Sequence, residues 1–237
     1  MKKKKIYVYA ISKNEEKFAK RWYESVKSAD GIYVLDTGST DNTVKILKEL
    51  GAKVTTKEIK PWRFDVARNE SLKLVPLDAD ICVCIDIDEV ISPNWREKLE
   101  EILENEKVNH VRYIYNWSHD ENKNPKVSFY YEKIHARKNF KWINPVHEVL
   151  KYTGSNEVWA TTNDIIVDHY PDSSKSRSSY LPLLELSVKE DPYNDRNVHY
   201  LGREYMYYGK LNEAIDTLIY HLSLKSATWK DERAASM

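Results

Sequence analysis

Three carboxylates follow an apolar run near the middle of the chain. Ile81–Ile85 is Ile-Cys-Val-Cys-Ile, and Asp86, Asp88 and Glu89 come directly after it. Asp86 and Asp88 are two residues apart, so on a continuing strand both side chains would leave the same face. Two carboxylates this close repel each other unless a cation lies between them. The pattern predicts a site for Mg²⁺ or Mn²⁺ that also holds phosphates, and solvated turn residues are the plain alternative.

Alternating strands and helices are expected before residue 105, which predicts a parallel α/β sheet with helices on both faces. In such open sheets ligands bind at the carboxyl ends of the strands, where the three carboxylates lie. The expected strands are Ile6–Ile11, Ile32–Asp36, a short one at Val54, and Ile81–Asp86; the expected helices are Glu15–Ser28, Asp41–Leu50, Asp65–Val75 and one that opens at Ser92-Pro93.

The alternation stops after residue 105, and two long strands without a helix between them suggest an antiparallel pair. From about Arg177 the chain becomes helical, so we expect one domain over residues 1–172 and a helical tail over residues 173–237. The later expected elements are strands at Val108–Trp117, Lys126–Arg137, His147–Tyr152 and Ile165–His169, then helices at Ser178–Glu190, Asn197–Tyr208 and Leu211–Leu224.

The helical tail fits the pattern of one tetratricopeptide unit, with Leu201-Gly202, Tyr205, Gly209 and Ala214 at the expected positions. One such unit cannot bury its own apolar face, so we expect it to pack on the sheet domain, on a second copy in a homodimer, or on further residues. Trp229 would begin the next unit, which suggests that the natural protein is longer.

The composition excludes several classes of protein. The chain of 237 residues carries 37 Lys+Arg and 37 Asp+Glu, so its formal net charge is zero, and this argues against a dedicated nucleic-acid binder. No apolar run is long enough to span a bilayer. The apolar stretch Ile6–Ile11 is too short for a signal peptide. Cys82 and Cys84 are expected to be buried thiols, so we predict a cytoplasmic protein.

Two classes of enzyme share an apolar strand that ends in Asp-x-Asp. Haloacid-dehalogenase-type phosphatases also need a later acidic pair for their metal, but no Asp-Asp occurs in this chain. Their nucleophile strand usually comes first in the domain, whereas the run at Ile81–Ile85 is the fourth expected strand. The second class transfers sugars from nucleotide-sugar donors.

Four segments resemble family 2 glycosyltransferases with the A-type fold, a Rossmann-like, mainly parallel sheet, over about residues 5–170. The string from Asp36 to Thr43 is especially specific, and the helical tail is similar to a subgroup with bacterial and phage-borne peptide and cell-wall glycosyltransferases. The four segments are Ile11–Glu16, Val34–Thr43, Phe64–Ser71 and Asp86–Glu89, and Pro145–Glu148 and Val167–Tyr170 also recur in the family.

The resemblance implies roles for single residues. Asp86, Asp88 and His169 would bind the metal, although His147 could replace His169 or orient Glu148. Glu148 would be the general base that takes the acceptor proton, with Asp120 and Asp168 as alternatives. The residues that would contact the nucleotide-sugar are Ile11, Lys13, Asn14, Glu15, Asp36, Arg68, Asp86 and Ile87.

The resulting hypothesis is an inverting glycosyltransferase that uses a UDP-sugar and Mn²⁺ or Mg²⁺. Its acceptor would be a glycan, a peptide or a cell-wall polymer. Aromatic and basic residues between 110 and 144 could form an acceptor wall, and ordinary core packing explains them equally well. The alternative is a non-catalytic, nucleotide-sugar-binding scaffold that docks a partner through its helical tail.

Overall fold

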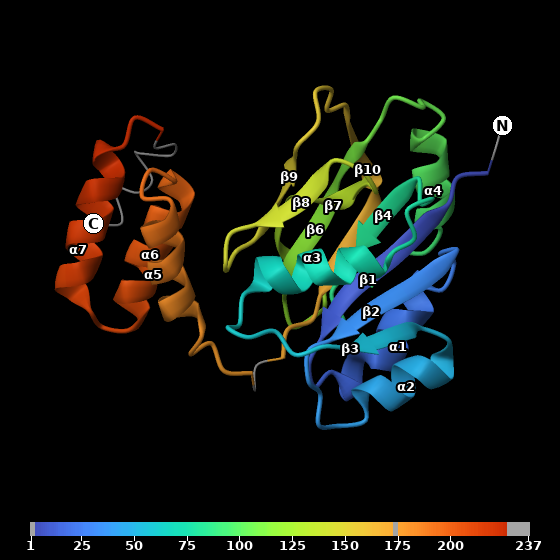
Figure 1. Cartoon of the computed structure of the whole chain (residues 1–237), viewed down its shortest axis with the longest axis horizontal. Helices are drawn as coiled ribbons and strands as arrows, with labels where there is room; N and C mark the ends of the chain where they lie inside the picture. The colour runs from blue at the N-terminus through green and yellow to red at the C-terminus, as the bar shows by residue number, and fades with distance from the viewer. Residues whose placement is uncertain (1–2, 173–174, 227–237) are drawn as a thin grey trace. The chain divides into compact units, whose positions relative to one another are not determined.

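Eight strands form one mixed sheet in the computed structural model, which describes residues 3–172 and 175–226. The strands are β1 (Ile6–Ser12), β2 (Gly31–Asp36), β3 (Lys53–Thr56), β4 (Ile81–Cys84), β5 (Glu89–Ile91), β6 (His110–His119), β7 (Pro125–Ala136) and β10 (Trp159–His169). Their order in the sheet is β3-β2-β1-β4-β7-β6-β10-β5 (Figure 1).

The first half of the sheet is parallel, because β2 and β4 flank β1 and β3 pairs with β2. β7 then joins β4 and β6 in antiparallel fashion, and β10 is parallel to β6. The predicted mixed, mainly parallel α/β sheet is confirmed. Its antiparallel part brings the long strands from the second half of the chain next to the strand that ends in the carboxylates.

Helices cover both faces of the sheet. On one face α1 (Glu16–Val26), α2 (Thr43–Leu50) and α4 (Trp95–Ile102) pack on alternate residues of the central strands, including Val8 and Val83. On the other face α3 (Phe64–Leu74) packs through Leu72 on the set that includes Tyr9 and Cys84. The strands are apolar on both sides because both sides are buried.

Short elements differ from the sequence expectations. β4 ends at Cys84, two residues before the expected end, and β5 is a strand of three residues that was not expected. A second sheet pairs β8 (Phe140–Ile143) with β9 (Val149–Tyr152), whereas the expected strand began at His147. His147 has φ 51°, a left-handed conformation that lies outside the β region of an extended strand.

The chain divides into two compact units. Residues 3–62, 66–143 and 149–172 form the first, and residues 63–65, 144–148 and 175–226 form the second. In the described part of the chain, no helix is both long and apolar enough to cross a membrane.

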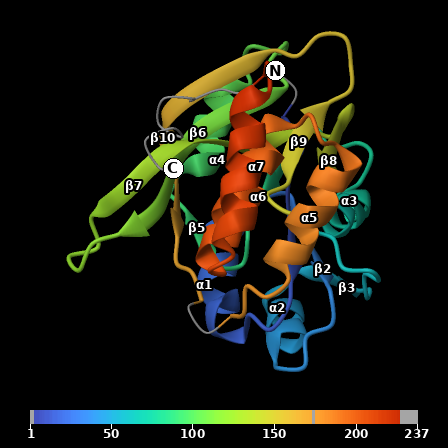
Figure 2. The same ribbon diagram turned by 90° about the vertical axis from the view of Figure 1, so that its left-hand side faces the viewer.

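The second unit contains three helices, α5 (Tyr180–Glu190), α6 (Asp195–Tyr207) and α7 (Leu211–Ser223), with α6 packed between the other two (Figure 2). Gly202 permits a close approach of α6 to α7, because a Cβ there would lie 2.7 Å from the side chain of Leu218. Trp229, expected to open a further repeat, lies outside the described residues.

A buried histidine makes the stability of the sheet domain depend on pH. His135 on β7 is fully buried; its Nε2 lies 2.8 Å from the Tyr9 hydroxyl and its Nδ1 lies 2.8 Å from the carbonyl oxygen of Ala136. Trp142 donates to the same Tyr9 hydroxyl at 2.9 Å. Burial lowers the pKa of His135 to about 3, so the folded protein keeps this ring neutral at pH values where the unfolded chain protonates it.

We therefore expect acid to destabilise the fold through His135. Since the unfolded chain binds the extra proton below pH 6.5, this residue alone should lower the free energy of unfolding by about 2 kcal/mol between pH 7 and pH 5. The check is urea unfolding of the wild type and of His135→Gln at both pH values. An equal loss of stability in the two proteins would contradict the prediction.

Candidate active site

The three carboxylates lie on a closed turn after β4 rather than on a continuing strand. The Asp86 N–H donates to Glu89 Oε2 at 2.7 Å, and the Glu89 N–H donates to the Asp86 carbonyl at 2.9 Å. The Trp22 indole of α1 donates to the carbonyl of Ile85 at 3.1 Å. Because the strand has already ended, the alternation of side chains that predicted one shared face for Asp86 and Asp88 does not apply.

Asp86 is held by two cations of the protein. Arg68 on α3 donates to both of its carboxylate oxygens, with Nη2 2.9 Å from Oδ2, and Lys133 Nζ on β7 lies 3.0 Å from Oδ2. Burial alone would raise the pKa of Asp86, but the charges and hydrogen bonds of Arg68 and Lys133 outweigh it and hold this pKa well below its usual range. Asp86 is therefore ionised and oriented without any metal.

Glu89 and Lys133 form a buried pair behind this turn. Their side chains are only 1% and 3% exposed, and Lys133 Nζ lies 2.7 and 2.9 Å from the two oxygens of Glu89. The Tyr115 hydroxyl donates to Glu89 at 2.9 Å. Burial would lower the pKa of Lys133, but Asp86 and Glu89 raise it well above its usual value. The sequence did not point to Lys133, which is one lysine within the expected strand Lys126–Arg137.

Asp88 faces a different partner. Its Oδ2 lies 3.4 Å from Nε2 of His169, and these side chains are 23% and 11% exposed. Nδ1 of His169 lies 3.2 Å from the Trp117 carbonyl oxygen, and the rings of His169 and Trp117 stack at 4.8 Å. A carboxylate oxygen and an imidazole nitrogen are both usual ligands of first-row divalent metals.

The structure thus brings together two of the three predicted metal ligands, Asp88 and His169, while Asp86 is turned toward Arg68 and Lys133. Among the residues that the structure describes, no group of three or more His, Cys, Asp or Glu side chains is placed to hold a metal ion. Asp88 and His169 would therefore supply part of a metal shell, and the substrate or water would complete it.

The predicted nucleotide loops meet at the ends of β1 and β2, where Ser12 pairs with Asp36. Asp36 is fully buried; its Oδ1 accepts from the N–H groups of Gly38 and Ser39 at 3.1 and 3.0 Å, so it organises the following turn. Asn14 joins the two loops, because its N–H donates to Ser39 Oγ at 2.9 Å and its side chain accepts from the Thr40 N–H at 2.7 Å.

The other predicted residues of these loops differ in exposure. Lys13 is exposed, and Ile11 is half-buried. Glu15 is buried, and its N–H donates to Thr43 Oγ1 at 2.7 Å. Ile87 is buried within the turn that carries Asp86 and Asp88. These loops lie at one edge of the sheet, because the parallel strands β1, β2 and β4 all end there.

The candidate bases have separate surroundings. Glu148 belongs to the second unit, next to His147, whose carbonyl accepts from Arg196 at 2.7 Å. Asp168 accepts from Asn116 Nδ2 at 2.7 Å and lies 2.9 Å from His119 Nε2. Because neighbouring strand residues point to opposite faces, Asp168 leaves β10 on the side away from the pair of Asp88 and His169.

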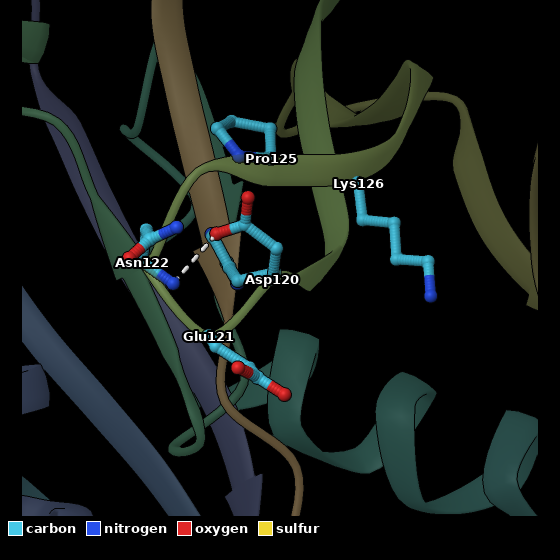
Figure 3. Close-up of a pocket in the computed structure, with 6 residues that line it drawn as sticks. Asp120, Glu121, Asn122, Pro125 and Lys126 are labelled. Atoms are coloured by element: carbon cyan, nitrogen blue, oxygen red, sulfur yellow. Dashed lines mark hydrogen bonds between the residues drawn. The ribbon is translucent and has the colours of Figure 1, made fainter.

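Asp120 has a structural role at the tip of the β6–β7 hairpin. Its Oδ1 accepts from the N–H groups of Asn122 and Asn124 at 2.9 and 2.8 Å. Figure 3 shows this turn around an open hollow that Asp120, Glu121 and Lys126 help to line. The backbone of the turn thus already engages the Asp120 carboxylate, which is one of the alternatives to Glu148 as the base.

Comparison with known proteins identifies the family. Residues 7–152, more than half of the chain, match the family described as glycosyl transferase family 2. The chain belongs to this family. The glycosyltransferase RT0209 of Rickettsia typhi is 38% identical over 112 residues, which are 47% of this chain and 36% of that relative. The match thus spans little more than a third of the length of this relative.

One solved structure supports the same fold over most of the chain. It is the structure of S. aureus TarS 1–349 in complex with UDP-GlcNAc. It aligns with a TM-score of 0.58 at 12% identity, over 93% of this chain and 81% of the TarS chain. This likeness shows the fold alone and agrees with the predicted A-type glycosyltransferase fold. Glucosyl-3-phosphoglycerate synthase from Mycobacterium tuberculosis, in complex with Mn²⁺ and UDP-glucose, is 26% identical over 47% of this chain and 44% of its own, with a TM-score of 0.41.

The indole of Trp22 should stabilise the carboxylate turn. Trp22→Phe leaves the buried carbonyl of Ile85 without its donor and should lower the free energy of unfolding by about 1–3 kcal/mol. Trp95→Phe is the matched control, because the buried Trp95 donates to the Ser25 carbonyl at 3.0 Å, away from the turn. Urea unfolding should show a similar loss in both variants, and an unchanged Trp22→Phe protein would contradict the prediction.

Proposed function

We propose that this family 2 glycosyltransferase is a metal-dependent, inverting enzyme that transfers a sugar from a UDP-sugar to an acceptor. The observation that carries the proposal is that the two aspartates on the turn after β4 have different partners. Asp86 is held by Arg68 and Lys133, while Asp88 lies beside His169, and the side chains of Asp86 and Asp88 are 25% and 23% exposed. One carboxylate is thus fixed for the nucleoside, and the other remains available to a metal.

The donor would lie at the ends of β1, β2 and β4. Lys13, Asn14 and Glu15 would flank the nucleobase and the ribose together with Ile11 and Asp36, and Asp86 and Ile87 would contact the ribose. Arg68 is buried against Asp86, so in this proposal it acts on the donor through that carboxylate. The geometry favours this arrangement because the loops that hold these residues end at one edge of the sheet.

Asp88 and His169 would hold Mn²⁺ or Mg²⁺, which when bound would stabilise the negative charge that grows on the diphosphate leaving group. The acceptor hydroxyl would attack the anomeric carbon as the bond from that carbon to the phosphate oxygen breaks. Glu148 would take the acceptor proton. The sugar would therefore become attached to the acceptor with inverted anomeric configuration.

Two substitutions separate binding from transfer. Asp88→Asn should lose the gain in UDP affinity that Mn²⁺ provides, while Glu148→Gln should keep that gain and lose transfer by about 10²- to 10⁴-fold. Calorimetry with UDP and Mn²⁺ measures the first effect, and UDP release from a panel of UDP-sugars with an acceptor measures the second. Asp168→Asn is the control and should keep most of the transfer activity.

Either of two results would refute parts of this proposal. An Asp88→Asn protein that binds UDP with Mn²⁺ as the wild type does would refute the metal assignment, and a nearly inactive Asp168→Asn protein would move the base to Asp168. A wild type that neither binds UDP nor releases it from any UDP-sugar would favour the non-catalytic scaffold.

The remaining assignments stay predictions of the same proposal. They are a domain boundary near residue 172, the tetratricopeptide-like nature of the tail, a homodimer through that tail and a cytoplasmic location. The close contact of Gly202 with Leu218 supports a tightly packed helical pair. An acceptor wall is supported by Trp117, which is 48% exposed and stacks on His169 beside Asp88.

A further inference from the structure

We propose that Lys133 is a positioning residue of the donor site, which acts through Asp86 and Glu89 and does not touch the substrate. The inference rests on the proposed function. The Lys133 ammonium has three N–H donors, and three carboxylate oxygens surround it. Nζ lies 3.0 Å from Asp86 Oδ2 and 2.7 and 2.9 Å from the two oxygens of Glu89.

The burial of Lys133 excludes a direct role in binding. Its side chain is 3% exposed, and Nζ lies 5.1 and 5.8 Å from the ring centroids of Tyr131 and Tyr115. A phosphate or a sugar at the edge of the sheet cannot reach an ammonium enclosed in this way. Any effect of Lys133 on the donor must therefore pass through the two carboxylates that it contacts.

Those carboxylates define the shape of the turn. Asp86 and Glu89 are bonded to each other through two backbone N–H groups, and Asp88 lies between them in the chain. Without Lys133, Asp86 would keep Arg68 alone, and the buried carboxylate of Glu89 would have no cation next to it. The turn would then relax, and both Asp86 and Asp88 would lose their fixed positions.

A purely structural ion pair would behave differently on replacement. Buried ion pairs can often be exchanged for neutral residues of similar size at little cost in stability. Lys133→Met combined with Glu89→Gln is such an exchange. The amide oxygen of the glutamine can still accept from the Asp86 N–H, and its NH2 group can donate to the Tyr115 hydroxyl, which can also accept. If Lys133 only stabilises the fold, this double variant should regain both stability and donor binding. If Lys133 positions Asp86, it should regain stability alone.

The experiment compares the wild type, Lys133→Met and the double variant by thermal unfolding and by calorimetry with UDP and Mn²⁺. We expect the double variant to unfold close to the wild-type temperature but to bind UDP at least about tenfold more weakly, since Asp86 has lost one charge-assisted hydrogen bond. With a UDP-sugar substrate, KM should rise more than kcat falls.

A matched control is available on α4. Arg96 is also a buried cation between two carboxylates, with Asp30 and Glu100 both at 2.9 Å, but it does not contact the turn after β4. Arg96→Met should lower the unfolding temperature and leave UDP affinity unchanged. This control separates a general loss of stability from a specific loss of donor binding.

The possible outcomes decide between the two roles. A double variant that binds UDP as tightly as the wild type would overturn the inference and leave the proposed function intact, whereas a wild type without UDP binding would overturn both. If the double variant does not fold, Lys133→Gln takes its place, because glutamine keeps N–H donors without the charge. A Lys133→Gln protein that binds UDP with wild-type affinity would also refute the inference. Failure of both variants to fold would show that the fold itself needs Lys133, against a positioning role.

Discussion

Four buried or partly buried charges behind one turn hold the candidate site together. Arg68, Asp86, Glu89 and Lys133 come from α3, the turn after β4, β5 and β7, and they form two cations against two anions. A charge in a protein interior is costly unless it is paired and hydrogen-bonded. The cluster is therefore compatible with the fold only if α3 lies over β4 and if β7 pairs beside it. The same arrangement of α3, β4 and β7 is therefore required by the sheet and by the candidate site.

The motif after β2 shows how one string of residues can serve both folding and function. Asp36 accepts from the backbone of Gly38 and Ser39, and Asp41 accepts from the N–H and the hydroxyl of Thr43 at 2.9 and 2.6 Å. Gly38 has φ 111°, a conformation that favours glycine. Most polar residues between Asp36 and Thr43 thus have a partner inside the protein. The residue types at these positions are therefore set largely by the turn that the segment must form.

The sequence predicted the parts of the fold that depend on local patterns. Apolar runs and capping residues located β1 to β4 and the helices between them, and the carboxylates after Ile85 located the edge of the sheet that carries the candidate site. The parts that depend on distant pairing were missed. β5 has three residues and gains its identity only from antiparallel pairing with β10. Lys133 meets Asp86 across 47 residues of chain, because β7 pairs with β4 in one register. No periodicity in a single segment contains that information.

The pairing of Asp86 with protein cations also bears on how a turn with several carboxylates can stay folded. Two free carboxylates on one turn would repel each other whenever the metal dissociates. Here Arg68 and Lys133 neutralise Asp86 permanently, and Asp88 is the more exposed partner of His169. In the proposed function, a divalent ion would therefore approach Asp88 and His169 without reorganising the buried cluster around Asp86. Such preorganisation would lower the cost of binding, because the protein has already ordered the groups that the donor and the metal would meet in the proposed function.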